Sequence, residues 1–216
     1  MTERKKFGGK RLVWGSFGAC VSGVWSSGAS AATVINRPSV IDLQGISAVD
    51  TAWLMTATIL VLLMTLPGIA LFYSGMVRRK NVLNTMASVI GIAAVVSLLW
   101  FAFGYSLSFT PGNGWIGSDS RFWFGGLDFD SVHQKVAVSH LAPHVPEAAF
   151  AMFQLAFAVI TASLLVGAWV ERMRFGGMLV FVGLWSLVVY APIAHWVWEP
   201  GGWLAKMGAL DFAGGT

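Results

Sequence analysis

Charged residues are scarce in this 216-residue chain and are missing altogether from four long stretches. Only 11% of the residues are Asp, Glu, Lys or Arg, whereas 56% are apolar. The uncharged stretches are Thr51–Val77, Asn81–Ser118, Ala148–Val170 and Phe175–Trp198. A helix crosses a bilayer with about 20 apolar residues, so each stretch is long enough. This composition excludes an ordinary soluble domain and predicts an all-α, polytopic membrane helix bundle.

Cysteine occurs once, as Cys20. Residues 1–31 combine a basic start, a moderately apolar core and the sequence Ala29-Ser30-Ala31, which is the pattern of a secretory signal peptide. We expect cleavage after Ala31; a short uncleaved anchor and a lipid-modified Cys20 are the alternatives. Cleavage would leave no cysteine in the mature chain, which excludes disulfides, thiol catalysis and cysteine-based metal sites.

A basic surface is also missing from most of the chain. The net charge of +4 comes from residues 1–31, because the rest has equal numbers of positive and negative residues. We therefore expect no nucleic-acid partner. The sequence also has no nucleophile–base pair, Gly-rich phosphate loop or metal-ligand spacing, so we expect no enzyme activity, no cofactor and no metal. An intramembrane hydrolase, the enzyme alternative, would need a Ser or Asp pair at helical depth.

The uncharged stretches predict where the membrane spans lie. Residues 32–50 are expected to be an external, polar lead-in, and residues 51–216 the membrane domain. The spans are predicted at about 51–77, 82–109, 148–170 and 175–198, with the start of a fifth at 209 and a long loop at 110–147. Pro67 predicts a kink in the first span, and the small residues Ala87, Gly91 and Ala94 predict a close helix contact on the second.

Basic residues occur on alternate connections, which predicts the orientation. Arg78, Arg79 and Lys80 follow the first span, and Arg172 and Arg174 follow the third. Such residues are enriched on the cytoplasmic side, so the 110–147 loop and the mature N-terminus are expected outside. A multi-pass protein of the bacterial inner membrane fits this pattern.

Aromatic residues supply the first candidate site. Phe153 and Phe157 are four residues apart and share a helix face, and Trp198 ends the fourth span at the same external level. Clustered aromatic faces can hold a small cation through cation–π attraction, whereas an interfacial aromatic belt with ordinary packing is the alternative. Gln154 is a polar residue in an apolar span and suits either a ligand site or an interhelical hydrogen bond.

Three further polar residues lie at or beyond the fourth span. Asp211 lies at an apparent helix start on the external side, where it could cap the helix or support a cation site electrostatically. His195 lies inside the span and suits a hydrogen-bonded packing role or a proton relay. Glu199 directly follows the span and is expected to be solvated.

Five segments, in this order and spacing, resemble the ammonium transporter family (Amt/Mep/Rh). They are LPGIALFYSGMVRRKNVLN (66–84), FGYSLSF (103–109), VGAWVERMRF (166–175), PIAHWVW (192–198) and GALDFAGGT (208–216). The resemblance covers about residues 50–216 and corresponds to the first half of the family sequence. It implies a homotrimer in which each subunit has eleven helices arranged as two inverted repeats around one pore.

The resemblance also implies roles for the candidate residues. Trp198 matches the tryptophan of an external vestibule that recruits ammonium, and Phe157 matches the vestibule and upper-gate phenylalanine. Phe153 and Gln154 match the pair just before it. Asp211 matches an aspartate that shapes the site without touching ammonium. Neutral ammonia would then cross the pore while two facing histidines relay the proton, and a cytoplasmic PII-type regulator is an implied partner.

The resemblance is incomplete at the C-terminal side of the chain. In the family, both pore histidines, the vestibule serine and the second gate phenylalanine lie beyond the position of Thr216, and His195 is not one of the paired histidines. We therefore expect this chain to be the N-terminal part of a transporter and to be inactive alone. An ammonium sensor shares the same membrane module and adds a C-terminal signalling domain, so only sequence beyond Thr216 would separate the two functions.

Overall fold

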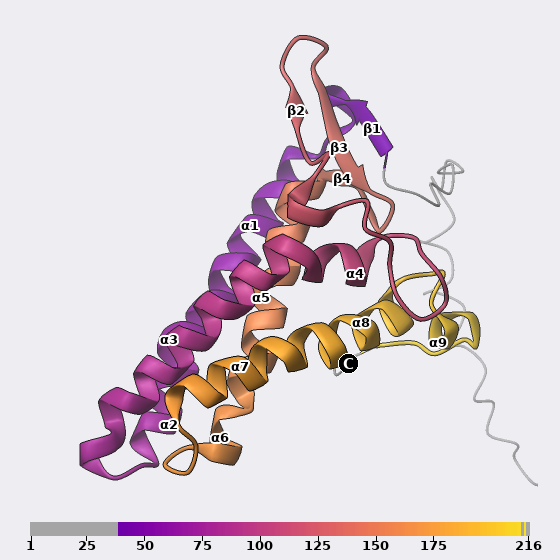
Figure 1. The fold of residues 1–216 in the computed structure, drawn as a ribbon. Helices are drawn as coiled ribbons and strands as arrows, with labels where there is room; N and C mark the ends of the chain where they lie inside the picture. Colours follow the sequence, from indigo (N-terminus) through magenta and orange to yellow (C-terminus); the bar gives the residue numbers. More distant parts are fainter. Residues whose placement is uncertain (1–38, 213, 215–216) are drawn as a thin grey trace, which may run out of the picture. The chain divides into compact units, whose positions relative to one another are not determined.

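The computed structural model describes residues 39–212 and residue 214, and the predicted signal peptide at 1–31 lies outside them. Four helical stretches in the described part are long and apolar enough to cross a membrane. They are Ala48–Gly75, Arg79–Phe109, Glu147–Trp169 and Phe175–Lys206. The prediction of a polytopic helix bundle is confirmed, and a small β-sheet lies at one end of it (Figure 1).

The first stretch begins inside the predicted lead-in. Helix α1 (Ala48–Leu63) follows Ser47, whose hydroxyl accepts a hydrogen bond from the backbone N–H of Asp50 at 3.2 Å. This is an ordinary N-cap, and Asp50 adds a favourable negative charge to the first turn. Pro67 lies in a π-helical segment, Met64–Ile69, that leads into α2 (Ala70–Gly75). The wider turn accommodates a residue that has no backbone N–H to donate.

The other three stretches are also built from shorter helices joined by irregular turns. The second contains α3 (Val82–Leu99), the π-helical segment Trp100–Gly104 and α4 (Tyr105–Phe109). The third contains α5 (Glu147–Leu164) and α6 (Val166–Trp169). The fourth contains α7 (Phe175–Trp185), the π-helical segment Ser186–Tyr190, α8 (Ala191–Trp198) and α9 (Trp203–Lys206).

Helix α3 packs against both α5 and α7. The buried Trp100, just after α3, donates from its indole nitrogen to the carbonyl of Ala151 on α5 at 3.1 Å. On the α7 side, a Cβ at Gly91 would lie 2.9 Å from Cζ of Phe175, so the glycine allows a close approach. Ala87 and Ala94 are exposed in the described chain. The predicted small-residue face is therefore in contact at Gly91, its centre.

The segment predicted as a long loop contains three strands, and the lead-in contains a fourth. They are β1 (Ser39–Asp42), β2 (Phe129–Asp130), β3 (Lys135–Ser139) and β4 (Ala142–Pro146). Strand β3 pairs antiparallel with each of the others, and Ser39 of β1 lies opposite Val138. The buried, β-branched Val136 and Val138 favour a strand. The partner strand β1 is far from β3 in sequence, so this pairing gives no local signal.

Candidate functional site

The candidate site is built around Trp198, the last residue of α8. Its indole nitrogen donates a hydrogen bond to Oδ2 of Asp211 at 2.8 Å. Its ring stacks on Phe109, the last residue of α4, with ring centroids 5.8 Å apart and planes 9° from parallel. The indole is therefore held both at its edge and on one face. We call Trp198, Asp211, Phe153, Gln154 and Phe157 the vestibule residues.

Asp211 is in direct contact with Trp198, another of the candidate residues. Its carboxylate is half-buried and accepts the hydrogen bond from Trp198, as a carboxylate partly removed from water requires. It lies in non-helical chain after α9, and several of the residues that follow it are outside the described part. The predicted helix start at 209 and the capping role thus remain predictions.

Phe153 and Phe157 form a second aromatic pair, on α5. Their rings meet edge to face with centroids 5.0 Å apart, and both residues are half-buried. Phe150, on the same face of the helix, packs edge to face on Phe109 at 5.4 Å. Phe109 therefore contacts both Trp198 and the aromatic face of α5. Sequence reasoning did not single out Phe109 or Phe150, although Phe109 ends one of the five recognised segments.

Gln154 is half-buried on α5, and its side chain forms no hydrogen bond within residues 39–212. The interhelical hydrogen bond suggested as one alternative is thus not seen in this part of the chain. A small cavity of about 100 Å³ lies near Trp198. Its lining residues are Thr161, Trp185, Val189, Tyr190, Ile193, Ala194 and Trp198.

His195 takes the partners expected of a packing residue. It is fully buried, and its Nδ1 and Nε2 lie 3.2 Å and 2.9 Å from the carbonyl oxygens of Ser108 and Asn113. These contacts tie α8 to the end of α4 and to the loop after it. The imidazole therefore connects backbone segments, and these contacts do not test the proton-relay alternative.

The expectation that Glu199 is solvated is wrong. Glu199 is 2% exposed, and its two carboxylate oxygens lie 3.0 and 2.9 Å from Nε2 of His140. His140 lies in the turn between β3 and β4. The two residues are far apart in sequence, so no spacing rule would have paired them, and a carboxylate directly after an apolar helix normally reaches water.

A second buried carboxylate begins α5. Glu147 is 1% exposed and forms a bidentate ion pair with Arg121, at 3.0 Å from Nε and 2.9 Å from Nη2. The hydroxyl of Tyr105 on α4 also donates to Glu147 at 3.0 Å. Two parallel N–H···O bonds fix the geometry as well as the charge. The start of the helix that carries Phe153 and Phe157 is thereby anchored to α4 and to the segment before β2.

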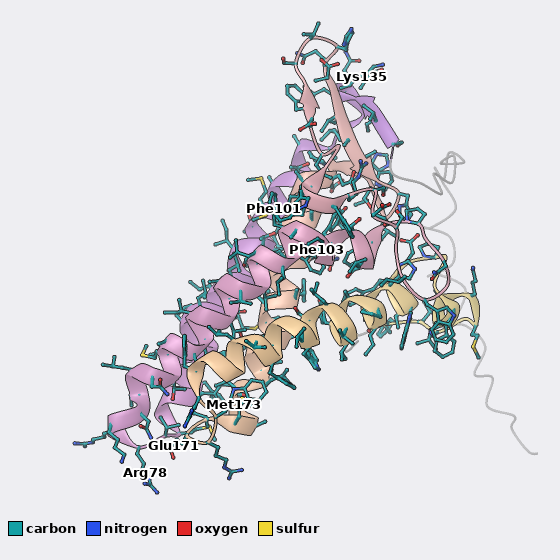
Figure 2. The ribbon with its side chains drawn as sticks, viewed as in Figure 1. Arg78, Phe101, Phe103, Lys135, Glu171 and Met173 are labelled. Atoms are coloured by element: carbon teal, nitrogen blue, oxygen red, sulfur yellow. The ribbon has the colours of Figure 1, made fainter. Side chains whose placement is uncertain are left out.

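The basic turns lie at the other end of the bundle. Figure 2 shows Arg78 and Glu171 at the end opposite Lys135 of the sheet. Glu171 is exposed and accepts hydrogen bonds from the Asn81 side chain at 2.7 Å and the Arg78 backbone N–H at 3.2 Å. The Asn81 bond, followed by the Arg78 bond, holds the pKa of Glu171 below its usual range. This carboxylate joins the two basic connections.

Four membrane-capable helices in the described part of the chain define the class as a polytopic membrane protein, and a half-buried aromatic–carboxylate cluster lies at one end of the bundle. A family model described as the Ammonium Transporter Family matches residues 52–216. The chain belongs to this family.

Individual proteins agree with this assignment. The chain is 47% identical over 167 residues to an ammonium transporter of Bacillus subtilis, covering 77% of this chain and 39% of that protein. The crystal structure of Candida albicans Mep2 matches with a TM-score of 0.69 and 38% identity, covering 81% of this chain and 37% of that one. A structure described as Sensor Amt Protein matches with a TM-score of 0.64 and 26% identity, covering 76% and 39%. The chain thus spans about two fifths of the length of these relatives.

Proposed function

We propose that the protein carrying this chain transports ammonium or ammonia across a membrane, and that the vestibule residues recruit the cation. The family assignment supplies the substrate class. The observation that carries the site is the Trp198 indole, which is held by Asp211 and Phe109 at one end of the bundle. A fixed aromatic face attracts a small cation by its quadrupole, and partial burial strengthens that attraction.

The vestibule residues have different roles in this proposal. Trp198 and Phe157 offer faces to the cation, and Phe153 and Gln154 shape the wall beside them. Asp211 orients the indole and adds a negative charge nearby without touching the ligand. Deprotonation must precede passage, because a bare ammonium ion is far costlier than ammonia to place in an apolar pore. The proton relay is assigned to the family's two facing histidines, neither of which is matched by His195.

The proposal includes an orientation and an assembly. The basic turns at Arg78–Lys80 and Arg172–Arg174 face the cytoplasm, and the sheet with the vestibule faces outward, in a multi-pass protein of the inner membrane. Residues 1–31 are removed as a signal peptide. The assembly is a homotrimer, and a PII-type regulator binds at the cytoplasmic end.

Orientation can be tested with single cysteines in a Cys20→Ser background. Asp128→Cys should react with a membrane-impermeant thiol reagent on intact cells, because Asp128 is exposed in the segment assigned to the outside. Lys80→Cys and Arg172→Cys should react only after the cells are permeabilised. Strong labelling at position 80 or 172 on intact cells would reverse the proposed orientation.

Recruitment can be tested in a fusion that continues this chain, after Thr216, with the unmatched C-terminal part of the Bacillus subtilis relative. Trp198→Leu should raise the apparent KM for methylammonium uptake by about 2- to 30-fold, corresponding to a cation–π contribution of about 0.5–2 kcal/mol. Asp211→Ala should reduce uptake further, because it removes a charge and leaves the indole N–H without its acceptor.

The matched control is Trp53→Leu, since Trp53 is 71% exposed on α1 and is not one of the vestibule residues. This variant should take up methylammonium as the unmodified fusion does. Normal uptake by a well-expressed Trp198→Leu variant would contradict the recruitment role.

A sensor is the second candidate function, and the similarity to the structure described as Sensor Amt Protein favours it. A sensor would recruit ammonium at the same residues and couple binding to a signalling domain. The two functions separate in a strain that lacks its own ammonium transporters. A transporter restores growth on low ammonium at mildly acidic pH, where little ammonia diffuses in, whereas a sensor that does not conduct leaves growth unrestored.

A further inference from the structure

A buried pair of side chains connects the β-sheet to the chain directly after the vestibule tryptophan. Nε2 of His140 lies 3.0 and 2.9 Å from the two carboxylate oxygens of Glu199. Each side chain is only 3% exposed. His140 lies in the β3–β4 turn, whereas Glu199 follows Trp198 in the chain. Neither residue has a role in the proposed recruitment of the cation.

This arrangement is costly for an isolated glutamate. A buried carboxylate loses the hydration that water would supply and needs a partner. Glu199 also follows the C-terminal end of α8, where the exposed carbonyl groups disfavour a negative charge. The imidazole of His140 is the hydrogen-bond partner recorded for its side chain in the described chain. Removing that partner is therefore expected to move Glu199 toward water, and the adjoining backbone with it.

The backbone of Glu199 is also held by hydrogen bonds. Its N–H donates to the carbonyl of His195 at 3.2 Å, and its carbonyl accepts from Gly202 at 2.8 Å. A Cβ at Gly202 would lie only 2.4 Å from the His195 oxygen, so the turn is closely packed. A shift of Glu199 would thus be transmitted to the end of α8, where Trp198 stacks on Phe109.

We propose that His140 and Glu199 form a positioning pair that holds Trp198 at the angle needed for cation recruitment, so that the β3–β4 turn helps to set the affinity for ammonium. This inference rests on the proposed function of Trp198. His140 donates from Nε2, Glu199 accepts, and neither side chain touches the cation. The sheet then contributes to substrate affinity through one buried contact.

The test uses the same fusion with the Bacillus subtilis relative and measures KM and maximal rate for methylammonium uptake. His140→Ala removes the donor and should raise KM about fivefold, within the range available to a cation–π contact, while the maximal rate stays within about twofold. His140→Gln returns an N–H donor near the position of Nε2 and should restore KM to near the unmodified value. Glu199→Gln removes the charge and one of the two acceptor oxygens, so it should raise KM by less than His140→Ala does.

His144→Ala is the matched control, because His144 is an exposed histidine on the same hairpin. It should leave KM unchanged. The decisive comparison is made in the Trp198→Leu background. If the pair acts through Trp198, Glu199→Gln should add no further rise in KM there, because residues acting through one contact are not additive.

The outcomes separate the two proposals. An unchanged KM for Trp198→Leu refutes the recruitment site itself. A raised KM for Trp198→Leu, with unchanged KM for His140→Ala and Glu199→Gln, refutes only the positioning pair. The positioning pair is also refuted if the rise in KM from Glu199→Gln adds fully to the rise from Trp198→Leu. It is refuted as well if His140→Ala and Glu199→Gln lower the maximal rate and the amount of folded protein without changing KM. Glu199→Gln and His140→Gln keep their side-chain size, so the test stands if His140→Ala does not fold.

Discussion

The two ends of the helix bundle differ in the surroundings of their glutamates. At the sheet end, Glu147 and Glu199 are 1% and 2% exposed, and each has a partner on a distant segment. At the other end, Glu171 and the basic residues of both turns are exposed. Exposed charges remain hydrated and contribute little to stability, whereas buried charges depend on their partners. Within the described residues, the buried carboxylates therefore lie at the sheet end, whereas the charges of the basic turns stay exposed.

The same contrast applies to the chain connecting the helices. At the basic end, the connections are short turns joined by Glu171, which contacts Asn81 and the Arg78 backbone. At the sheet end, the long 110–147 segment folds into strands and returns to contact α4, α5 and α8. The proposed recruitment site lies at the end where these long-range contacts concentrate.

The largest expected effect comes from breaking the Arg121–Glu147 pair. Glu147→Ala leaves Arg121 without its bidentate partner at a largely buried position. Loss of one member of a buried pair costs about 3–5 kcal/mol, so the protein in detergent should unfold at a clearly lower temperature. Asp119→Ala, at an exposed position in the same segment, is the control and should unfold as the unmodified protein does. Equal unfolding temperatures for the two variants would contradict the contribution of the buried pair to stability.

A pair of glycines gives the next test. A Cβ at Gly202, at the sheet end, would lie 2.4 and 2.5 Å from the carbonyl oxygens of His195 and Trp196, which are backbone atoms and cannot easily move. Gly202→Ala should cost about 1–3 kcal/mol, as overpacking does. Gly176 is the second residue of α7, near the basic end, and a Cβ there meets nothing within 4 Å. Gly176→Ala should be neutral or stabilising by up to about 1 kcal/mol. Thermal unfolding of both variants measures the difference, and a Gly202→Ala variant as stable as Gly176→Ala would show that the turn is loosely packed.

The smallest expected effect is at Glu171. Its pKa is lower in the folded protein than the ordinary value of about 4.3. Ionised Glu171 therefore adds stability above the ordinary pKa, and this contribution disappears as pH falls through the lower, folded-state pKa. Glu171→Gln should be slightly less stable than the unmodified protein near neutral pH, and the difference should shrink below pH ~4. Unfolding temperatures across this range provide the measurement; a difference that grows on acidification would contradict the assignment.

The helices could be predicted because their signal is local. The length and composition of each uncharged stretch are enough to predict a membrane span. The irregular turn at Pro67 follows from a missing backbone N–H. The candidate residues Trp198 and Asp211 were found because the segments around them are recognisable by themselves, and their direct hydrogen bond agrees with a shared site.

The pairings could not be predicted, because they join segments that only the folded chain brings together. Strand β1 is four residues long, and its partner β3 lies beyond two membrane helices. The burial of Glu199 depends on a histidine in a turn of that same sheet. The apolar length of a helix is a property of consecutive residues, so the sequence alone determined the spans and the family. The cost of burying a charge depends on what lies around it in space, so only the tertiary structure decided which carboxylates are buried and how Trp198 is held.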